Sequence, residues 1–171
     1  IGVGKMIEPR ISFPWPSQVE SSFGTNLVDD INRLVKKTKF ELVIMAYNLN
    51  LNTDFVLLQA IKNRLISTNP SIKLFCDNST TAYTFLELFH DWRDNLSIWH
   101  WRDTDENYSK FHIKAVAVDK NMMYIGSANF SKTAMEHSAE CGLFINSPDC
   151  YDSLMAYTSS LEESGLLKKI N

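Results

Sequence analysis

The chain has 171 residues, of which 44% are hydrophobic and 22% are charged, and its formal net charge is −3. This balance suits one globular domain with one hydrophobic core. It contains no apolar run long enough to cross a bilayer as a helix. Its net charge is not that of a basic nucleic-acid-binding domain, although a local basic patch could still bind phosphate.

The N-terminal segment differs in pattern from the rest of the chain. Residues 1–20 are expected to form an extension, because Pro14 and Pro16 exclude a regular helix or a central strand there. Residues 21–171 are predicted to form a single domain. The chain begins with Ile1 rather than Met, which leaves a larger parent protein open.

Helix and strand patterns alternate through the predicted domain. Apolar residues at helical spacing predict helices, and short runs rich in β-branched and aromatic residues predict strands. In chain order we expect a helix over 21–38, a strand over 40–47, a helix over 53–67, a strand over 72–76, a helix over 81–92, a strand over 96–101, two strands over 111–118 and 122–127 joined by a turn, a strand over 140–145 and a helix over 149–161. This order indicates an α/β domain, with a mixed, mostly parallel β-sheet flanked by helices on both faces.

The chain has three cysteines, and none of them has the CxxC spacing of a metal or redox site. Cys76 and Cys141 lie in apolar, strand-like runs, where a free thiol behaves as a small buried hydrophobe. The N-terminus lacks the design of a secretory signal, with a charged part before an apolar part. Reduced thiols and the missing signal together predict a cytoplasmic location.

The most informative stretch is residues 111–130, FHIKAVAVDKNMMYIGSANF. His112 and Lys114 have the same parity in a predicted strand, so their side chains are expected on one face. Ser127 and Asn129 share a parity at the end of the next strand. A hairpin between these strands would bring an imidazole, an ammonium, a hydroxyl and an amide to one end of a sheet.

Such a group of side chains suits a phosphate. Lys114 is a charged donor for a non-bridging oxygen, and Ser127 and Asn129 add neutral donors. His112 has an imidazole nitrogen that can attack phosphorus and form a covalent phosphohistidine. An unperturbed histidine has a pKa of about 6.5, so the attacking ring is neutral at ordinary pH.

The pattern HxKxxxxD followed by GSxN resembles the HKD motif of the phospholipase D superfamily, in its single-motif bacterial nuclease type. Glu140, eleven residues after Asn129, stands where the compact bacterial nucleases of this superfamily have a glutamate that hydrogen-bonds the nucleophilic histidine. The run Asn-Phe-Ser-Lys over 129–132 is also typical of them. The resemblance extends over about residues 21–161 and implies the phospholipase D-like fold.

The resemblance implies a role for each matching residue. His112 is expected to be the nucleophile in one subunit and the acid for the leaving group in the other, while Glu140 orients it. Lys114 would bind phosphate oxygens together with Ser127 and Asn129. The other two signature positions, Asp119 and Gly126, are expected to be structural. The proposed chemistry needs no metal and no cofactor.

One motif in a chain of this length implies that two chains share an active site. The mechanism uses two histidines, one to attack and one to protonate the departing oxygen. A two-fold dimer places two copies of His112 across one cleft. We therefore expect a homodimer.

The predicted substrate is nucleic acid, because short single-motif members of the superfamily mostly resemble nucleases. Trp99, Trp101 and Tyr108 precede the motif and could stack on bases, with core packing as the alternative for the two tryptophans. The candidate nucleic-acid contacts are Arg102, Tyr108, Lys110 and Lys132. A module of a restriction or phage-defence system fits this prediction. Two alternatives remain open: a phospholipid phosphodiesterase or transferase, and a nucleic-acid-binding subunit that is inactive alone.

Overall fold

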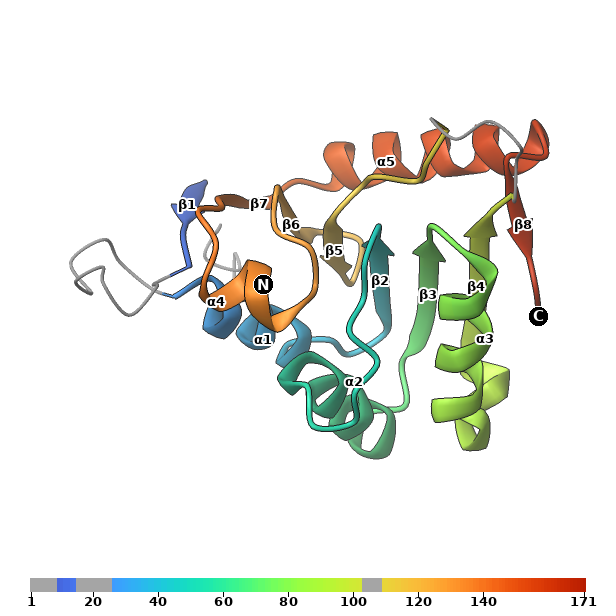
Figure 1. Cartoon of the computed structure of the whole chain (residues 1–171), viewed down its shortest axis with the longest axis horizontal. Coiled ribbons are helices and arrows are strands. Elements are labelled where there is room, and N and C mark those ends of the chain that lie inside the picture. Colours follow the sequence, from blue (N-terminus) through green and yellow to red (C-terminus); the bar gives the residue numbers. More distant parts are fainter. Residues whose placement is uncertain (1–8, 15–25, 103–108) are drawn as a thin grey trace, which may run out of the picture.

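The computed structural model describes residues 9–14, 26–102 and 109–171. These residues form one eight-stranded sheet in the order β1-β7-β6-β5-β2-β3-β4-β8, with helices on both faces (Figure 1). The strands are β1 Arg10–Ser12, β2 Glu41–Ala46, β3 Ser71–Cys76, β4 Leu96–Trp101, β5 Ala115–Val118, β6 Met122–Gly126, β7 Gly142–Asn146 and β8 Leu167–Lys169. The helices are α1 Leu27–Lys36, α2 Val56–Ser67, α3 Ser79–Leu88, the 3-10 helix η2 His90–Asn95, α4 Lys132–Glu136 and α5 Pro148–Glu163.

The prediction of a mixed sheet with helices on both faces is confirmed, but its description as mostly parallel is wrong. Only the pairs β2–β3 and β3–β4 are parallel in the part of the chain described, and the other five neighbouring pairs are antiparallel. The helices α2 and α3 form the crossovers that parallel neighbours require. The connection between β5 and β6 is too short for a crossover, so these strands pair antiparallel. Much of the connection over 127–141 is not helical, and β6 and β7 also pair antiparallel.

The edges of the sheet are two three-residue strands that the sequence pattern did not reveal. Within the segment expected to be an extension, β1 pairs with β7, so Ile11 lies opposite Leu143. At the other edge β8 pairs with β4. The sheet therefore extends beyond the predicted boundary at residue 21.

The first helix begins later than predicted. Asn26 is its N-cap, and the side chain of this residue accepts a hydrogen bond of 3.1 Å from the backbone N–H of Val28. Such a cap satisfies one of the donors that a helix start leaves unpaired. Acidic residues in the first turn and basic ones in the last turn complement the helix dipole.

Two hydrophobic cores lie on the two faces of the sheet. The larger core packs α1, α2, α3 and α4 against one face, and the smaller core packs α5 against the other. Figure 1 shows α1, α2 and α3 gathered along one side of the sheet and α5 apart from them. Trp99 and Trp101 are buried in the smaller core, and the Trp99 ring stacks on Phe75 with centroids 4.6 Å apart. These two tryptophans therefore pack in the core, and the alternative of base stacking does not apply to them.

The cysteines divide between the interior and the surface. Cys76 is buried, and this burial raises the pKa of its thiol to about 12. Cys141 was predicted to be buried within a strand but is exposed, and it lies just before β7, which begins only at Gly142. Across the part of the chain that the structure describes, no helix has the length and apolar character needed to cross a membrane.

Candidate active site at one end of the sheet

The motif residues come together because β2 and β6 end, and β5 and β7 begin, at the same end of the sheet. β5 is antiparallel to β2 and to β6, and β6 is antiparallel to β7. The carboxyl ends of β2 and β6 therefore lie beside the amino ends of β5 and β7. The loops following β2 and β6 are also paired, since Phe130 N–H donates to the Asn48 carbonyl over 3.0 Å and Asn50 N–H donates to the Phe130 carbonyl over 2.8 Å.

His112 lies in a segment without regular secondary structure before β5, which begins at Ala115 rather than at the predicted Phe111. The His112 side chain is exposed, and Lys114 is 94% buried. The ammonium of Lys114 lies 2.9 Å from His112 Nδ1 and 2.9 Å from the His112 carbonyl oxygen. An ammonium can only donate, so the ring nitrogen that it contacts must carry a lone pair. The same ammonium lies 3.3 Å from His112 Nε2, so both ring nitrogens are within reach of the lysine.

Tyr47, immediately after β2, completes the surroundings of His112. The two rings have centroids 4.4 Å apart and are tilted by 50°. The ammonium groups of Lys114 and Lys110 lie 5.4 and 5.8 Å from the centre of the Tyr47 ring. Tyr47 was not among the residues predicted for the site. Its place directly after a buried strand, at the end of the sheet where ligands bind in α/β proteins, is the signal that could have identified it.

Lys114 is held in a mixed electrostatic environment. Burial lowers the pKa of the Lys114 ammonium, and the charge of Glu140 opposes part of that effect. Loss of the Glu140 charge is therefore expected to lower the pKa of Lys114 further.

Ser127 is the hydrogen-bond partner of Glu140. The Ser127 hydroxyl donates to Glu140 Oε2 and accepts a hydrogen bond of 3.1 Å from the backbone N–H of Cys141. The expected hydrogen bond between Glu140 and His112 does not occur among the described residues. Glu140 lies before β7, directly across from the end of β6, and Ser127 is therefore the nearer partner.

Asn129 lies in the same loop as Ser127. Its side-chain Oδ1 is buried and has no hydrogen-bond partner within the described ranges. A buried polar atom of this kind needs an explanation, because leaving it unpaired costs free energy. Its place in the motif makes this atom a candidate for a contact with a bound group or water.

Glycine at positions 126 and 142 makes room for the buried ring of Tyr124. The two glycines are cross-strand neighbours. A Cβ at Gly126 would lie 2.7 Å from both the Cys141 carbonyl oxygen and Tyr124 Cζ, and one at Gly142 would overlap the same ring. The glycine before Ser127 thus allows Tyr124 to fill the space beneath the site.

Two aspartates fix the backbone around the motif. Asp119, in the turn after β5, accepts hydrogen bonds of 2.8–3.2 Å from the N–H groups of three consecutive residues at the start of β2. It stands at the opposite end of β5 from His112. Asp77, directly after β3, accepts a hydrogen bond of 2.8 Å from Phe111 N–H and so holds the beginning of the His112 segment.

The candidate nucleic-acid contacts come from different elements of the fold. Lys110 is exposed beside Tyr47, close to the motif. Lys132 is exposed at the start of α4, and Arg102 is exposed after β4. Tyr108 lies outside the described residues.

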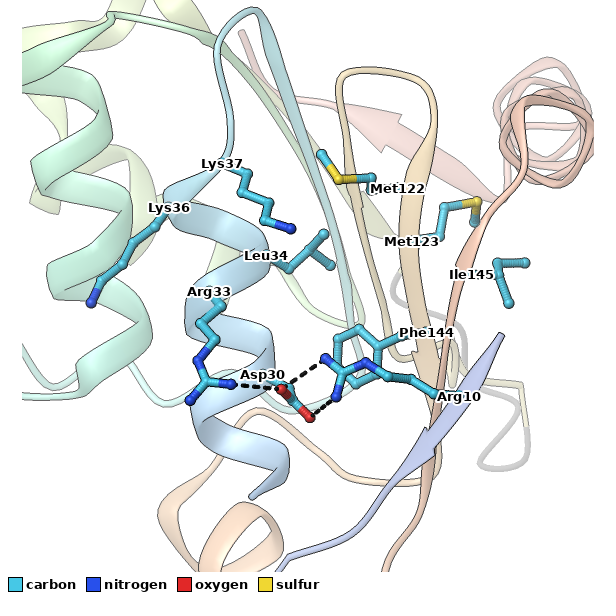
Figure 2. A pocket seen from close by; sticks show the side chains of 10 residues that line it. All are labelled: Arg10, Asp30, Arg33, Leu34, Lys36, Lys37, Met122, Met123, Phe144 and Ile145. Atoms are coloured by element: carbon cyan, nitrogen blue, oxygen red, sulfur yellow. Dashed lines mark hydrogen bonds and ion pairs between the residues drawn. The ribbon is translucent and has the colours of Figure 1, made fainter. Parts of the chain in front are cut away.

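A separate pocket of about 400 Å³ lies at the other end of β6 and β7, beside α1 (Figure 2). Arg10 and Arg33 both point toward Asp30 there. Asp30 Oδ1 lies 2.8 Å from Arg10 Nη2 and 3.6 Å from Arg33 Nη1. These cations already have an internal counter-ion. Within residues 9–14, 26–102 and 109–171, no group of three or more His, Cys, Asp or Glu side chains is placed to hold a metal ion.

The sheet order and the polar cluster at the ends of β2, β5, β6 and β7 define a domain of the phospholipase D-like class. The model of the family described as "Cardiolipin synthase, PLD-like domain" matches residues 31–161. The chain therefore belongs to this family of the phospholipase D superfamily. No curated protein matches it in sequence.

Solved structures with the same fold include two that the chain covers almost from end to end. Nuc, a phospholipase D family member from Salmonella typhimurium, is 17% identical with a TM-score of 0.63, and the match covers 96% of this chain and 99% of Nuc. NucT from Helicobacter pylori is 17% identical with a TM-score of 0.68, over 92% of this chain and 98% of NucT. Phosphatidylserine synthase from Haemophilus influenzae is 19% identical with a TM-score of 0.68, over 95% of this chain but 40% of the synthase. At these identities the likeness concerns the fold.

Proposed function

We propose that this protein is a metal-independent phosphodiesterase, and most specifically a nuclease, that forms a covalent phosphohistidine at His112. The observation that supports this most is the exposed imidazole of His112, which lies 2.9 Å from the ammonium of Lys114. A nucleophile and a phosphate-binding cation are thus adjacent at an open end of the sheet.

The first chemical step is an attack by a ring nitrogen of His112 on phosphorus. A phosphoryl oxygen that approaches the site competes for the Lys114 ammonium and releases the nitrogen that the ammonium had contacted. The N–P bond forms as the P–O bond to the leaving oxygen breaks, and that oxygen takes a proton from a second histidine. Water then attacks phosphorus, returns a proton to the second histidine and frees His112.

In this step, two side chains contact the phosphate and one carboxylate supports them. The first two are Ser127 and Asn129, and the carboxylate is that of Glu140. The Ser127 hydroxyl and the Asn129 side chain lie in the loop that faces the phosphate. The Glu140 carboxylate accepts a hydrogen bond from Ser127, and its charge opposes part of the effect of burial on the pKa of Lys114. Orientation of His112 by Glu140, as the resemblance implies, would require a shift of this carboxylate from Ser127 when substrate binds.

The second histidine is proposed to come from another copy of the chain. The sequence has four histidines, and His112 is the one in the motif. A homodimer with His112 from both copies in one cleft supplies the acid that the leaving oxygen needs. We further propose that the protein acts in the cytoplasm as a module of a restriction or phage-defence system.

Nucleic acid is the preferred substrate for two reasons. The short structures named Nuc and NucT are covered almost completely by this chain, whereas the synthase is more than twice as long as the matched part. Lys110 and Tyr47 also place an exposed cation and a half-buried aromatic ring beside His112, a combination suited to a phosphate backbone and its bases.

Transfer of a phosphatidyl group is the second candidate. The family description and the synthase structure favour it. An alcohol would then attack phosphorus in place of water, giving its proton to the second histidine, and the phosphatidyl group would pass to it as the N–P bond to His112 breaks. Release of a phosphatidyl product from vesicles, without cleavage of nucleic acid, would support this function over the nuclease.

The test is a cleavage assay with labelled single- and double-stranded DNA and RNA in excess EDTA. The wild type is compared with His112→Ala and with His137→Ala, which removes an exposed histidine outside the motif. We expect cleavage that resists the chelator, disappears in His112→Ala and persists in His137→Ala. Cleavage abolished by EDTA would contradict the metal-independent mechanism, and cleavage by His112→Ala would contradict the role of the histidine.

A further inference from the structure

A lysine-rich segment joins α1 to β2 at the end of the sheet opposite the motif. Residues 36–40 have the sequence KKTKF, and Lys36, Lys37, Lys39 and Phe40 are exposed. Phe40 is 75% exposed, the largest fraction among the exposed large hydrophobic residues in the described part of the chain. One exposed phenyl ring is ordinary on a protein surface. This ring differs because three lysines accompany it, so an apolar face and positive charge occur together.

The backbone of this segment is fixed on both sides of Phe40. The Asp119 carboxylate accepts hydrogen bonds of 2.8–3.2 Å from the N–H groups of Lys39 and Phe40. The Phe40 carbonyl accepts a hydrogen bond of 2.9 Å from Ser71 N–H, at the start of β3. Because this backbone is already ordered, binding of a partner to the exposed ring costs little further conformational entropy.

A fourth lysine reaches this end of the sheet from the turn between β5 and β6. Asp119 N–H donates to the Glu41 carbonyl over 2.9 Å, which places the turn beside the residue that follows Phe40. Lys120 is exposed and has φ 59°, after φ 51° at Asp119. Glycine and asparagine adopt this left-handed conformation more readily than lysine. The turn alone therefore does not explain a lysine here, whereas a role for its charge does. We call the following residues the lysine surface: Lys36, Lys37, Lys39, Phe40 and Lys120.

Two carboxylates at this end of the sheet are bonded within the fold. Asp119 accepts the backbone hydrogen bonds, and Glu41 forms an ion pair of 2.7 Å with Lys73. Within residues 9–14, 26–102 and 109–171, none of the four lysines of the lysine surface forms an ion pair. Their charges repel one another without an internal counter-ion, so an anion with several charges binds here favourably.

The pocket beside α1 adjoins the lysine surface. Its described lining has four cations, among them Lys36 and Lys37, and one carboxylate, so it carries a net charge of +3 whereas the whole chain carries −3. Figure 2 shows the Lys37 side chain extending from the end of α1 toward the strands. Met122, which also lines the pocket, lies opposite Val118 and two residues after Lys120. The pocket therefore offers a recess for a phosphate beside these lysines.

We propose that the lysine surface binds the phosphate backbone of a single-stranded nucleic acid and that Phe40 stacks on one of its bases, an inference that rests on the proposed function. Proteins bind single strands through cations that follow the backbone and aromatic rings that stack on bases. A bilayer fits less well, because membrane-surface helices insert a continuous apolar face. The apolar face of α1 is buried in the larger core.

The lysine surface is distinct from the motif. His112 and Asp119 are seven residues apart, which is about 23 Å along an extended chain at about 3.3 Å per residue. A stacked strand has one phosphate per about 3.4 Å, so it needs about seven nucleotides to reach both places. The lysine surface thus holds the strand several nucleotides away from the bond that is cleaved.

The test is the binding of a fluorescently labelled single strand of about twenty nucleotides, measured by anisotropy over a range of salt concentrations. The protein carries His112→Ala so that the strand is not cleaved. Lys37→Gln, Phe40→Ala and Lys120→Asn are added one at a time. Asn accepts the left-handed conformation, so Lys120→Asn should fold at least as stably as its parent and decides the result if another variant does not fold.

Two matched controls remove the same groups elsewhere. Lys62→Gln neutralises an exposed lysine on α2, and Tyr83→Ala removes a ring on α3 from a residue that is 55% exposed. We expect Phe40→Ala to raise the Kd at least about fivefold. Lys37→Gln and Lys120→Asn should each reduce the slope of the logarithm of the binding constant against that of the salt concentration by about 0.7. The controls should change neither quantity.

No binding of the strand, unchanged binding in all three surface variants, or an equal loss in the controls would overturn the proposal. An equal dependence on Phe40 for a duplex of the same sequence would contradict stacking on an unpaired base. Binding of phosphatidylglycerol-containing vesicles through Phe40, without binding of the strand, would overturn the proposal in favour of membrane contact. Cleavage with a KM that the surface variants do not raise would reject only the lysine surface. Surface-dependent binding without cleavage by the protein with His112 intact would reject only the proposed function.

Discussion

Replacement of Asp119 by Asn separates a structural role of this signature residue from a catalytic one. The Asp119 carboxylate accepts hydrogen bonds from the backbone N–H groups of Lys39, Phe40 and Glu41. Asp119 has φ 51°, a left-handed conformation that Asn tolerates better than most residues. The substitution therefore changes the charge and one acceptor without adding backbone strain.

The expected loss of stability follows from these contacts. Asn keeps one oxygen, which can still accept from Phe40 and Glu41, but its amide replaces the oxygen that lies 3.0 Å from Lys39 N–H. A buried hydrogen bond to a charged group contributes about 1.5–3 kcal/mol, and exposure to solvent reduces that contribution here. We expect a loss of about 1.5 kcal/mol, and a melting temperature lower by about 3–6 °C.

Urea unfolding gives the free energy of unfolding, and a phosphodiesterase assay at a temperature where both proteins are folded gives the turnover. Asp54→Asn, an exposed loop substitution, is the control and should change stability by less than about 0.5 kcal/mol. Asp119→Asn should retain its turnover per folded molecule. Unchanged stability, or turnover lost at unchanged stability, would refute the assignment of Asp119 to a structural role.

Three further predictions concern packing and ionisation. Gly142→Ala should lower the free energy of unfolding by about 1–3 kcal/mol, because its Cβ would overlap the buried Tyr124 ring; an unchanged urea midpoint would contradict this. The Lys114 pKa, followed by NMR of its Cε, should lie below 10.5 and fall further in Glu140→Gln, since the carboxylate raises it; a rise in that variant would be inconsistent. Burial raises the pKa of Glu41, but hydrogen bonds from Lys73 and Tyr151 and nearby positive charges lower it overall. The stability advantage of wild type over Glu41→Gln is thus present above pH 4.5 and lost as the pH falls through the lowered pKa, and urea unfolding at several pH values should show that decline.

The central part of the fold was predictable because its elements have strong local patterns. β2 is buried at all six positions, in agreement with the continuous apolar run that predicted a strand covered on both faces. The three-residue edge strands β1 and β8 were not predicted. They are too short for a periodic signal, and pairing with β7 and β4 forms them.

The candidate site was predictable to the extent that the motif is local in sequence. Its spacing correctly suggested that His112 and Lys114 would lie close together, and the structure has their side chains in contact. Tyr47 and Asp77 follow other strands, so only the sheet order brings them to the motif. The contact of Glu140 with Ser127 depends on how the loop before β7 faces the end of β6, which sequence spacing does not specify.

The covalent intermediate offers the most direct test of the central claim. Bis(p-nitrophenyl) phosphate is mixed with the enzyme in EDTA, the reaction is quenched in alkali, where phosphohistidine persists, and the protein is analysed by intact-mass and peptide mass spectrometry. The account predicts a p-nitrophenyl phosphoryl adduct on His112 and a matching release of p-nitrophenolate, both absent from His112→Ala. Turnover of the diester without any adduct on His112, or with an equal adduct elsewhere in the His112→Ala protein, would contradict it.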